Sequence, residues 1–96
     1  MSVWIRKITG DRSKNFLKLG EDVWDLRVLY KEFETWVKEE ASGLEIGEGW
    51  IADIGFSPRP GANGGGPILT PEVMKICVEK NISIYLSEYN DIEENA

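Results

Sequence analysis

The chain has 96 residues, of which 42% are hydrophobic and 29% charged, and we expect residues 1–96 to form a single domain. This composition excludes a disordered chain, and no apolar run approaches the about 18 residues that a membrane-spanning helix requires. The one cysteine, Cys77, excludes an internal disulfide, and the first residues lack the basic-then-apolar pattern of a secretion signal. Both features favour a reducing, cytoplasmic location.

The chain is acidic, and its charged residues are unevenly distributed along the sequence. Seventeen acidic against eleven basic residues give a net charge of -6, with +4 on residues 1–20 and -10 on residues 21–96. An acidic body repels nucleic acid and anionic lipid, so neither is an expected partner. It attracts a basic protein and speeds the encounter with it. The alternative is that the charge serves only solubility.

The first half of the chain predicts one strand and one long helix. Residues 3–9 are β-branched and aromatic, which is typical of a strand, and residues 10–20 read as a polar, basic connection. Residues 21–42 contain neither proline nor glycine, and they carry acids where a first turn is expected, which predicts a helix closed by a left-handed Gly43. One apolar arc of that helix is expected to face the core: Val23, Leu26, Leu29, Tyr30, Phe33, Trp36 and Val37.

The second half predicts a hairpin, a helix and a final strand. Residues 44–46 and 50–56 flank a short glycine-containing turn, and residues 57–67 read as a loop. Residues 71–80 predict a helix, with Thr70 as its N-cap and Asn81 at its end. Residues 82–89 predict a strand, and residues 91–96 an acidic, frayed tail.

These elements predict an α+β fold in the order β-α-β-β-α-β. Two helices would cover one face of a largely antiparallel sheet, as in the ferredoxin-like split βαβ arrangement. The sheet has four strands if residues 44–46 pair and three if they do not.

The glycine-rich segment 59–70, RPGANGGGPILT, raises the possibility of an anion site at the start of a helix. It lacks the lysine and following hydroxyl of a phosphate-binding loop, and its glycines do not enter the helix directly after a strand. A flexible connection is therefore the favoured interpretation. In the alternative, a small anion would bind to Arg59, Gly64, Gly65 and Thr70.

The chain lacks the usual means of catalysis and metal binding. It contains no histidine, and a lone cysteine cannot build a tetrahedral zinc site. Cys77 falls on an apolar helix side, which favours a core position over a nucleophile. A carboxylate cluster of Asp53 with Glu45, Glu48 and Glu88 is the one acid–base alternative. We therefore expect no enzymatic activity, no bound metal and no cofactor.

Two apolar residues, Trp24 and Val28, fall outside the helix arc, among charged residues. Either residues 16–19 fold back and cover them, or they form the anchor of a protein interface. Asp25, Glu32 and Glu39 recur every seven residues and form an acidic stripe on the same helix. With Glu45 and Glu48 as a charged rim, this surface would bind a basic protein.

Residues 50–89 run WIADIGFSPRPGANGGGPILTPEVMKICVEKNISIYLSEY. This segment resembles the second half of a bacterial domain family of unknown function, numbered 4279. The resemblance rests on an aromatic strand, a glycine-containing loop, a capped helix and a strand of alternating polarity. The first half of the chain is short for that family, and only the helix at 21–42 aligns loosely. The resemblance implies a bacterial α+β domain without an assigned active site, and it transfers no functional residue.

By analogy of class, small acidic bacterial proteins without histidine often serve as immunity proteins. The sequence hypothesis is therefore an immunity-type inhibitor that neutralises a basic, nuclease-type toxin by direct contact. The alternative is a regulatory domain that binds a small ligand or anion through residues 59–70. The oligomeric state stays open.

Overall fold

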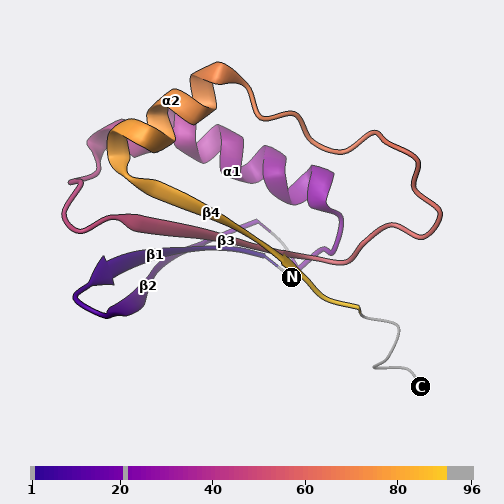
Figure 1. Cartoon of the computed structure of the whole chain (residues 1–96), viewed down its shortest axis with the longest axis horizontal. Helices are drawn as coiled ribbons and strands as arrows, with labels where there is room; N and C mark the ends of the chain where they lie inside the picture. The colour runs from indigo at the N-terminus through magenta and orange to yellow at the C-terminus, as the bar shows by residue number, and fades with distance from the viewer. Residues whose placement is uncertain (1, 21, 91–96) are drawn as a thin grey trace.

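The computed structural model describes residues 2–20 and 22–90. The predicted acidic tail at residues 91–96 lies outside them. The elements in chain order are strands β1 (Val3–Thr9) and β2 (Arg12–Leu19), helix α1 (Leu26–Glu40), a short 3₁₀ turn (Ala41–Gly43), strand β3 (Trp50–Phe56), helix α2 (Pro71–Lys80) and strand β4 (Ile82–Glu88). The α+β class is confirmed, and Figure 1 shows both helices above the sheet.

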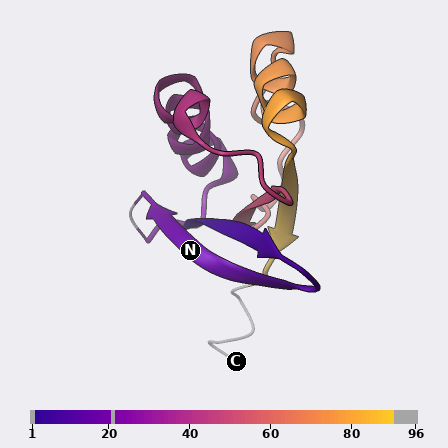
Figure 2. The ribbon, with the colours of Figure 1, turned by 90° about the vertical axis from the view of Figure 1, so that its left-hand side faces the viewer.

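The four strands form one sheet in the order β2-β1-β3-β4. β1 pairs antiparallel with both β2 and β3, whereas β3 and β4 run parallel, so the sheet is mixed. Both helices lie on the same face, and neither covers the opposite face, which is called the open face below (Figure 2). The chain order is β-β-α-β-α-β, so the ferredoxin-like order is not confirmed.

The expectation of a polar connection at residues 10–20 was wrong, because residues 12–19 form β2. A two-residue turn joins β1 to β2, with Thr9 opposite Arg12 and Gly10 at a φ of 66°. Glycine takes this left-handed conformation without steric cost, which suits the first position of such a turn. A bulge in β2 turns Phe16 toward Trp50, and their ring centroids lie 4.9 Å apart.

The predicted strand at residues 44–46 does not form. Both sides of β3 are taken by other strands, with Lys7 of β1 and Ile82 of β4 each opposite Trp50. The pairing of β1 with the β3 side extends one residue further, because the Ile8 amide donates to the Gly49 carbonyl at 3.0 Å. Residues 44–49 are instead a loop that leads into β3.

Helix α1 begins at Leu26 rather than at residue 21, with Asp25 as its N-cap. Its first turn contains no acid, which corrects the expected acidic first turn. The helix tightens into the 3₁₀ turn at its end, so Gly43 is not a left-handed cap. The predicted core face is correct from Leu26 onward, and its buried members are Leu29, Tyr30, Phe33, Trp36 and Val37. Val23 precedes the helix and is partly buried against the core.

Helix α2 follows its sequence signals closely. The Thr70 hydroxyl accepts from the Val73 amide at 3.4 Å, and Asn81 ends the helix at a left-handed φ of 54°. Cys77 faces the core as expected, and burial raises the pKa of its thiol. The core lies between both helices and the covered sheet face, and it includes Val3, Ile5, Phe33, Ala52, Ile54 and Val73.

Candidate binding surface at the start of α1

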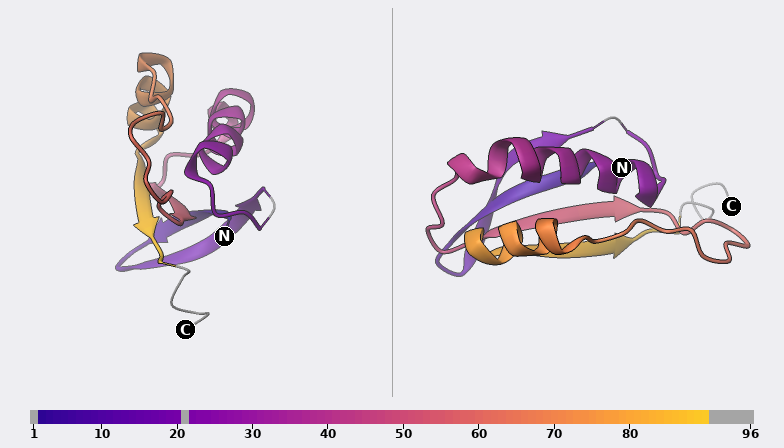
Figure 3. Two further views of the ribbon diagram at one scale, coloured as in Figure 1. Left: turned by 90° about the vertical axis from the view of Figure 1, so that its right-hand side faces the viewer. Right: turned by 90° about the horizontal axis from the view of Figure 1, so that it is seen from above.

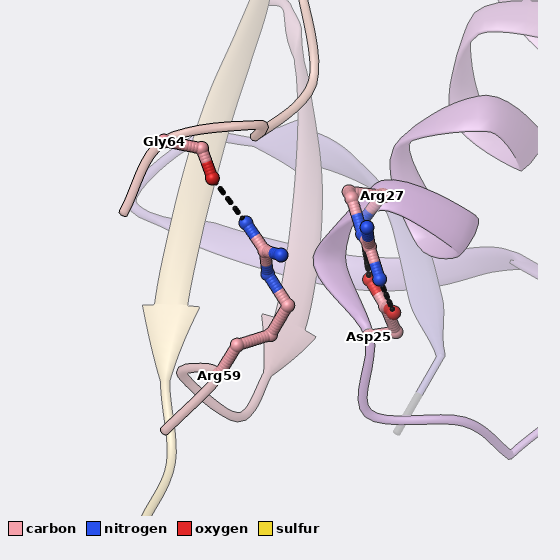
Figure 4. Close-up of polar contacts among 4 residues, drawn as sticks. All are labelled: Asp25, Arg27, Arg59 and Gly64. Carbon is pink, nitrogen blue, oxygen red and sulfur yellow. Dashed lines mark hydrogen bonds and ion pairs between the residues drawn. The ribbon is translucent and has the colours of Figure 1, made fainter. Parts of the chain in front are cut away.

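Asp25 holds the first turn of α1 in place. Its carboxylate accepts from the Arg27 amide at 2.9 Å and from the Arg27 guanidinium, Nη2 to Oδ2, at 2.8 Å (Figure 4). The hydrogen bonds from the Arg27 side chain, followed by that from its amide, lower the pKa of Asp25 to about 2. The carboxylate is therefore committed to helix capping and a local ion pair, and it is not a free charge for a partner.

Trp24 connects this first turn to two other segments. Its carbonyl accepts from the Ser57 amide, after β3, at 2.8 Å. Its ring meets Tyr89, after β4, edge to face, with centroids 6.1 Å apart. Residues 16–19 do not cover Trp24 or Val28, because they lie in β2. Trp24 stays 36% exposed and Val28 48% exposed, so the covering alternative was wrong.

A hollow of about 510 Å³ opens beside Trp24. Its lining comes from the start of α1, from the segment after β3 and from the segment after β4, and comprises Trp24, Asp25, Ser57, Pro58, Arg59, Pro60 and Asn90. It therefore lies at the carboxyl ends of two parallel strands, a place where open sheets with helical crossovers commonly bind ligands. The walls combine an aromatic ring and two prolines with one guanidinium and one carboxylate.

The predicted partner-binding residues do not form one surface. Asp25, Val28 and Glu32 line a second hollow of about 430 Å³ with Arg27 and Lys31. Asp25 also lines the hollow beside Trp24, so the two hollows adjoin. Glu39 is exposed about two helical turns beyond Glu32.

Glu45 and Glu48 lie beyond the far end of α1, which has 15 residues and therefore spans about 22 Å. Glu48 accepts from the Gly10 amide at 3.0 Å, so it joins the loop before β3 to the β1–β2 turn. The predicted acidic rim is consequently absent from the surface that carries Trp24.

Three of the four predicted anion-binding residues meet in the loop after β3. The Arg59 Nη2 donates to the Gly64 carbonyl at 2.6 Å (Figure 4), and Gly64 and Gly65 take left-handed φ values of 96° and 79°. A Cβ at Gly65 would lie 3.7 Å from the same guanidinium nitrogen. Thr70 lies apart, because its hydroxyl caps α2. Arg59 thus closes its own loop and also lines the hollow.

The acid–base alternative around Asp53 does not form. The Asp53 carboxylate binds the Arg6 guanidinium at 2.6 Å and accepts from the Ser87 hydroxyl at 2.6 Å. Glu48 is engaged elsewhere, and among residues 2–20 and 22–90 no group of three or more His, Cys, Asp or Glu side chains is arranged to hold a metal ion. Asp53 is a structural ion-pair residue on the open sheet face.

Sequence reasoning missed several residues of the hollow, chiefly Pro58, Pro60 and Asn90. The available signal was their position, since each follows the carboxyl end of a predicted strand. Finding them required knowing that the two strands are parallel neighbours, which the expected hairpin concealed.

Comparison of the chain with protein-family models, curated proteins and solved structures gave no significant match. The resemblance of residues 50–89 to family 4279 therefore stays a prediction. Within the described ranges, no helix has the length and apolar character needed to cross a membrane.

Proposed function

We propose that this protein acts by binding a basic protein in the bacterial cytoplasm, as an immunity-type inhibitor of a nuclease-type toxin, without catalysis of its own. The observation that carries the proposal is the exposure of Trp24 and of Val28, which lines a hollow together with Glu32. A partly exposed tryptophan is typical of an interface anchor, because it offers a large rigid apolar area.

The charge around this anchor supports a basic partner. Glu32 and Glu39 are exposed, and neither forms an ion pair with another of the described residues. Glu34, by contrast, pairs with Lys31 at 3.7 Å and with Lys38 at 3.9 Å. The two free carboxylates and the net charge of -6 would accelerate encounter with a cationic surface.

The test begins with a search of the genes beside the one for this chain for a basic nuclease domain, which is then purified and mixed with the chain. We expect Glu32→Lys to lower the association rate constant by about tenfold at low salt, because steering charges act mainly on association. Stopped-flow tryptophan fluorescence measures that rate.

The matched control is Glu79→Lys, which makes the same charge change at an exposed position of α2. Its association rate is expected to change much less. Equal slowing by both variants would show that only net charge matters. Failure of the wild-type chain to bind or inhibit the nuclease would refute the proposal itself.

A second candidate function is anion binding in the hollow beside Trp24, as part of a small-ligand regulatory domain. It is favoured by the position of Arg59 at the carboxyl ends of β3 and β4. An anion would have to compete with the Gly64 carbonyl for the guanidinium, so we expect weak binding.

Titration with phosphate and with sulfate, followed by tryptophan fluorescence, tests this candidate. Trp24 is the appropriate reporter, since Trp50 is buried at the other end of β3. We expect saturation in the millimolar range for the wild type and none for Arg59→Gln, because the charge-assisted contact is lost. A response that survives Arg59→Gln would exclude this site.

A further inference from the structure

The two edges of the sheet are built differently. β2, at one edge, carries Arg12, Lys14 and Lys18 and contains a bulge, features by which proteins protect exposed edges from pairing. β4, at the other edge, has no lysine, arginine or proline, and its register with β3 is unbroken. Its only charged residue is Glu88, at its last position.

The backbone of β4 offers hydrogen-bonding groups at this edge. The Asn81 carbonyl accepts from the Trp50 amide at 2.9 Å, and the Tyr89 amide donates to the Phe56 carbonyl at 2.8 Å. Since backbone groups alternate in direction along a strand, the odd-numbered residues of β4 face β3. The N–H and C=O groups of residues 82, 84, 86 and 88 therefore point to the free edge.

Helix α2 adds apolar side chains above the same edge. Glu72 reaches Lys38 of α1 at 3.5 Å, which identifies the flank of α2 that faces α1. Met74 and Val78, one helical turn apart, lie on the opposite flank and are 45% and 80% exposed. Figures 2 and 3 show α2 above β4 along one side of the molecule.

We propose that two copies of this chain form a dimer by antiparallel pairing of β4 with β4, which joins the two sheets into one. A two-fold axis through this edge also brings the Met74–Val78 flank of one α2 against that of the other. An interface of this kind presents the same patch on both copies, so the patch has to be self-complementary.

The sequence of β4 meets this requirement when the axis passes through Tyr85, the middle of the seven-residue strand. Ile84 then lies opposite Leu86 of the second copy, and Tyr85 lies opposite its own counterpart. The hydrogen-bonded pairs fall at even positions, which are those whose backbone groups point outward. The two Glu88 carboxylates lie at opposite ends of the paired strands, so like charges do not meet.

Sedimentation velocity of the full chain tests the dimer. We expect a concentration-dependent species of twice the chain mass, and we expect Val78→Lys and Leu86→Lys each to weaken it about tenfold or more, because each places a charge in the apolar contact. Val28→Lys, a valine exposed on α1, is the control and leaves the dimer unchanged. A wild-type chain that sediments as a monomer at high micromolar concentration, or a dimer that resists both substitutions, overturns the proposal.

A cysteine cross-link tests the register. Directly opposed residues of a pair without mutual hydrogen bonds have Cβ atoms about 4.5–5.5 Å apart, close enough for a disulfide after small adjustment. Tyr85→Cys is therefore expected to give a covalent dimer on mild oxidation. Ser83→Cys, on the same face of β4, is the control, since its counterpart would lie about 13 Å away. Cross-linking at both positions, or at position 83 alone, contradicts pairing centred on Tyr85, and so does the absence of cross-linking at 85.

Discussion

Replacing Phe33 by alanine is expected to lower the free energy of unfolding by about 3–5 kcal/mol, the usual cost of removing a large buried aromatic side chain. Phe33 is fully buried on the inner face of α1. Its ring lies between Tyr30 and Trp36, with centroid distances of 5.9 and 6.4 Å. The aromatic neighbours cannot collapse into the space without losing their own contacts, so a cavity would remain.

Urea unfolding followed by far-UV circular dichroism measures this effect. Because small domains have total stabilities of about 5–15 kcal/mol, this loss is a large fraction of the total, and the urea midpoint of Phe33→Ala is expected to fall well below that of the wild type. Val28→Ala, on the exposed side of the same helix, controls for the change in helix propensity and is expected to shift stability by about 0.5 kcal/mol or less. A comparable loss in both variants would mean that α1 does not pack as described.

Replacing Gly49 by alanine is expected to destabilise the fold by about 1–3 kcal/mol from backbone strain alone, with a further cost from steric overlap. Gly49 has a φ of 115°, a conformation that residues with a Cβ rarely adopt. An added Cβ would lie 2.7 Å from the Asn81 side-chain nitrogen and 3.1 Å from the Asn81 carbonyl oxygen. That carbonyl accepts from the Trp50 amide, so relief of the overlap would disturb the start of β3–β4 pairing.

Gly43→Ala is the matched control for this second substitution. Gly43 does not take a left-handed φ, and a Cβ there meets nothing within 4 Å. The thermal unfolding midpoint of Gly43→Ala is expected to stay near or slightly above that of the wild type, since alanine restricts the conformations of the unfolded chain. An equal drop for Gly49→Ala and Gly43→Ala would show that strain at position 49 is not the cause.

The elements with local signals were predictable from the sequence. Helix α2 has its N-cap Thr70, its first-turn proline Pro71 and its terminal Asn81 within a dozen residues, and the structure uses all three as expected. The buried arc of α1 follows from helical periodicity in the same way. β3 and β4 also form where their apolar alternation predicts them.

The errors concern pairing between distant segments. Residues 12–18 are all exposed, so β2 has no apolar alternation to reveal it, and its pairing with β1 decides its conformation. Residues 44–46 have strand-like composition, but β1 and β4 take both positions beside β3. Propensity cannot choose between two candidates for one sheet edge, because that choice depends on contacts far along the chain.

The candidate binding surface likewise has some features that the sequence predicts and others that depend on the tertiary structure. The sequence by itself determined that Val28 lies outside the core face of α1, since helical spacing shows it, and that the body is acidic. Trp24 precedes the helix, so its exposure was decided by the tertiary structure. Only the tertiary structure decided that Trp24 meets Tyr89, that Arg59 turns back to Gly64, and that β4 becomes an edge strand. Capping and periodicity act over a few residues and can be read locally, whereas strand order and the hollow beside Trp24 arise from segments that meet only when the chain folds.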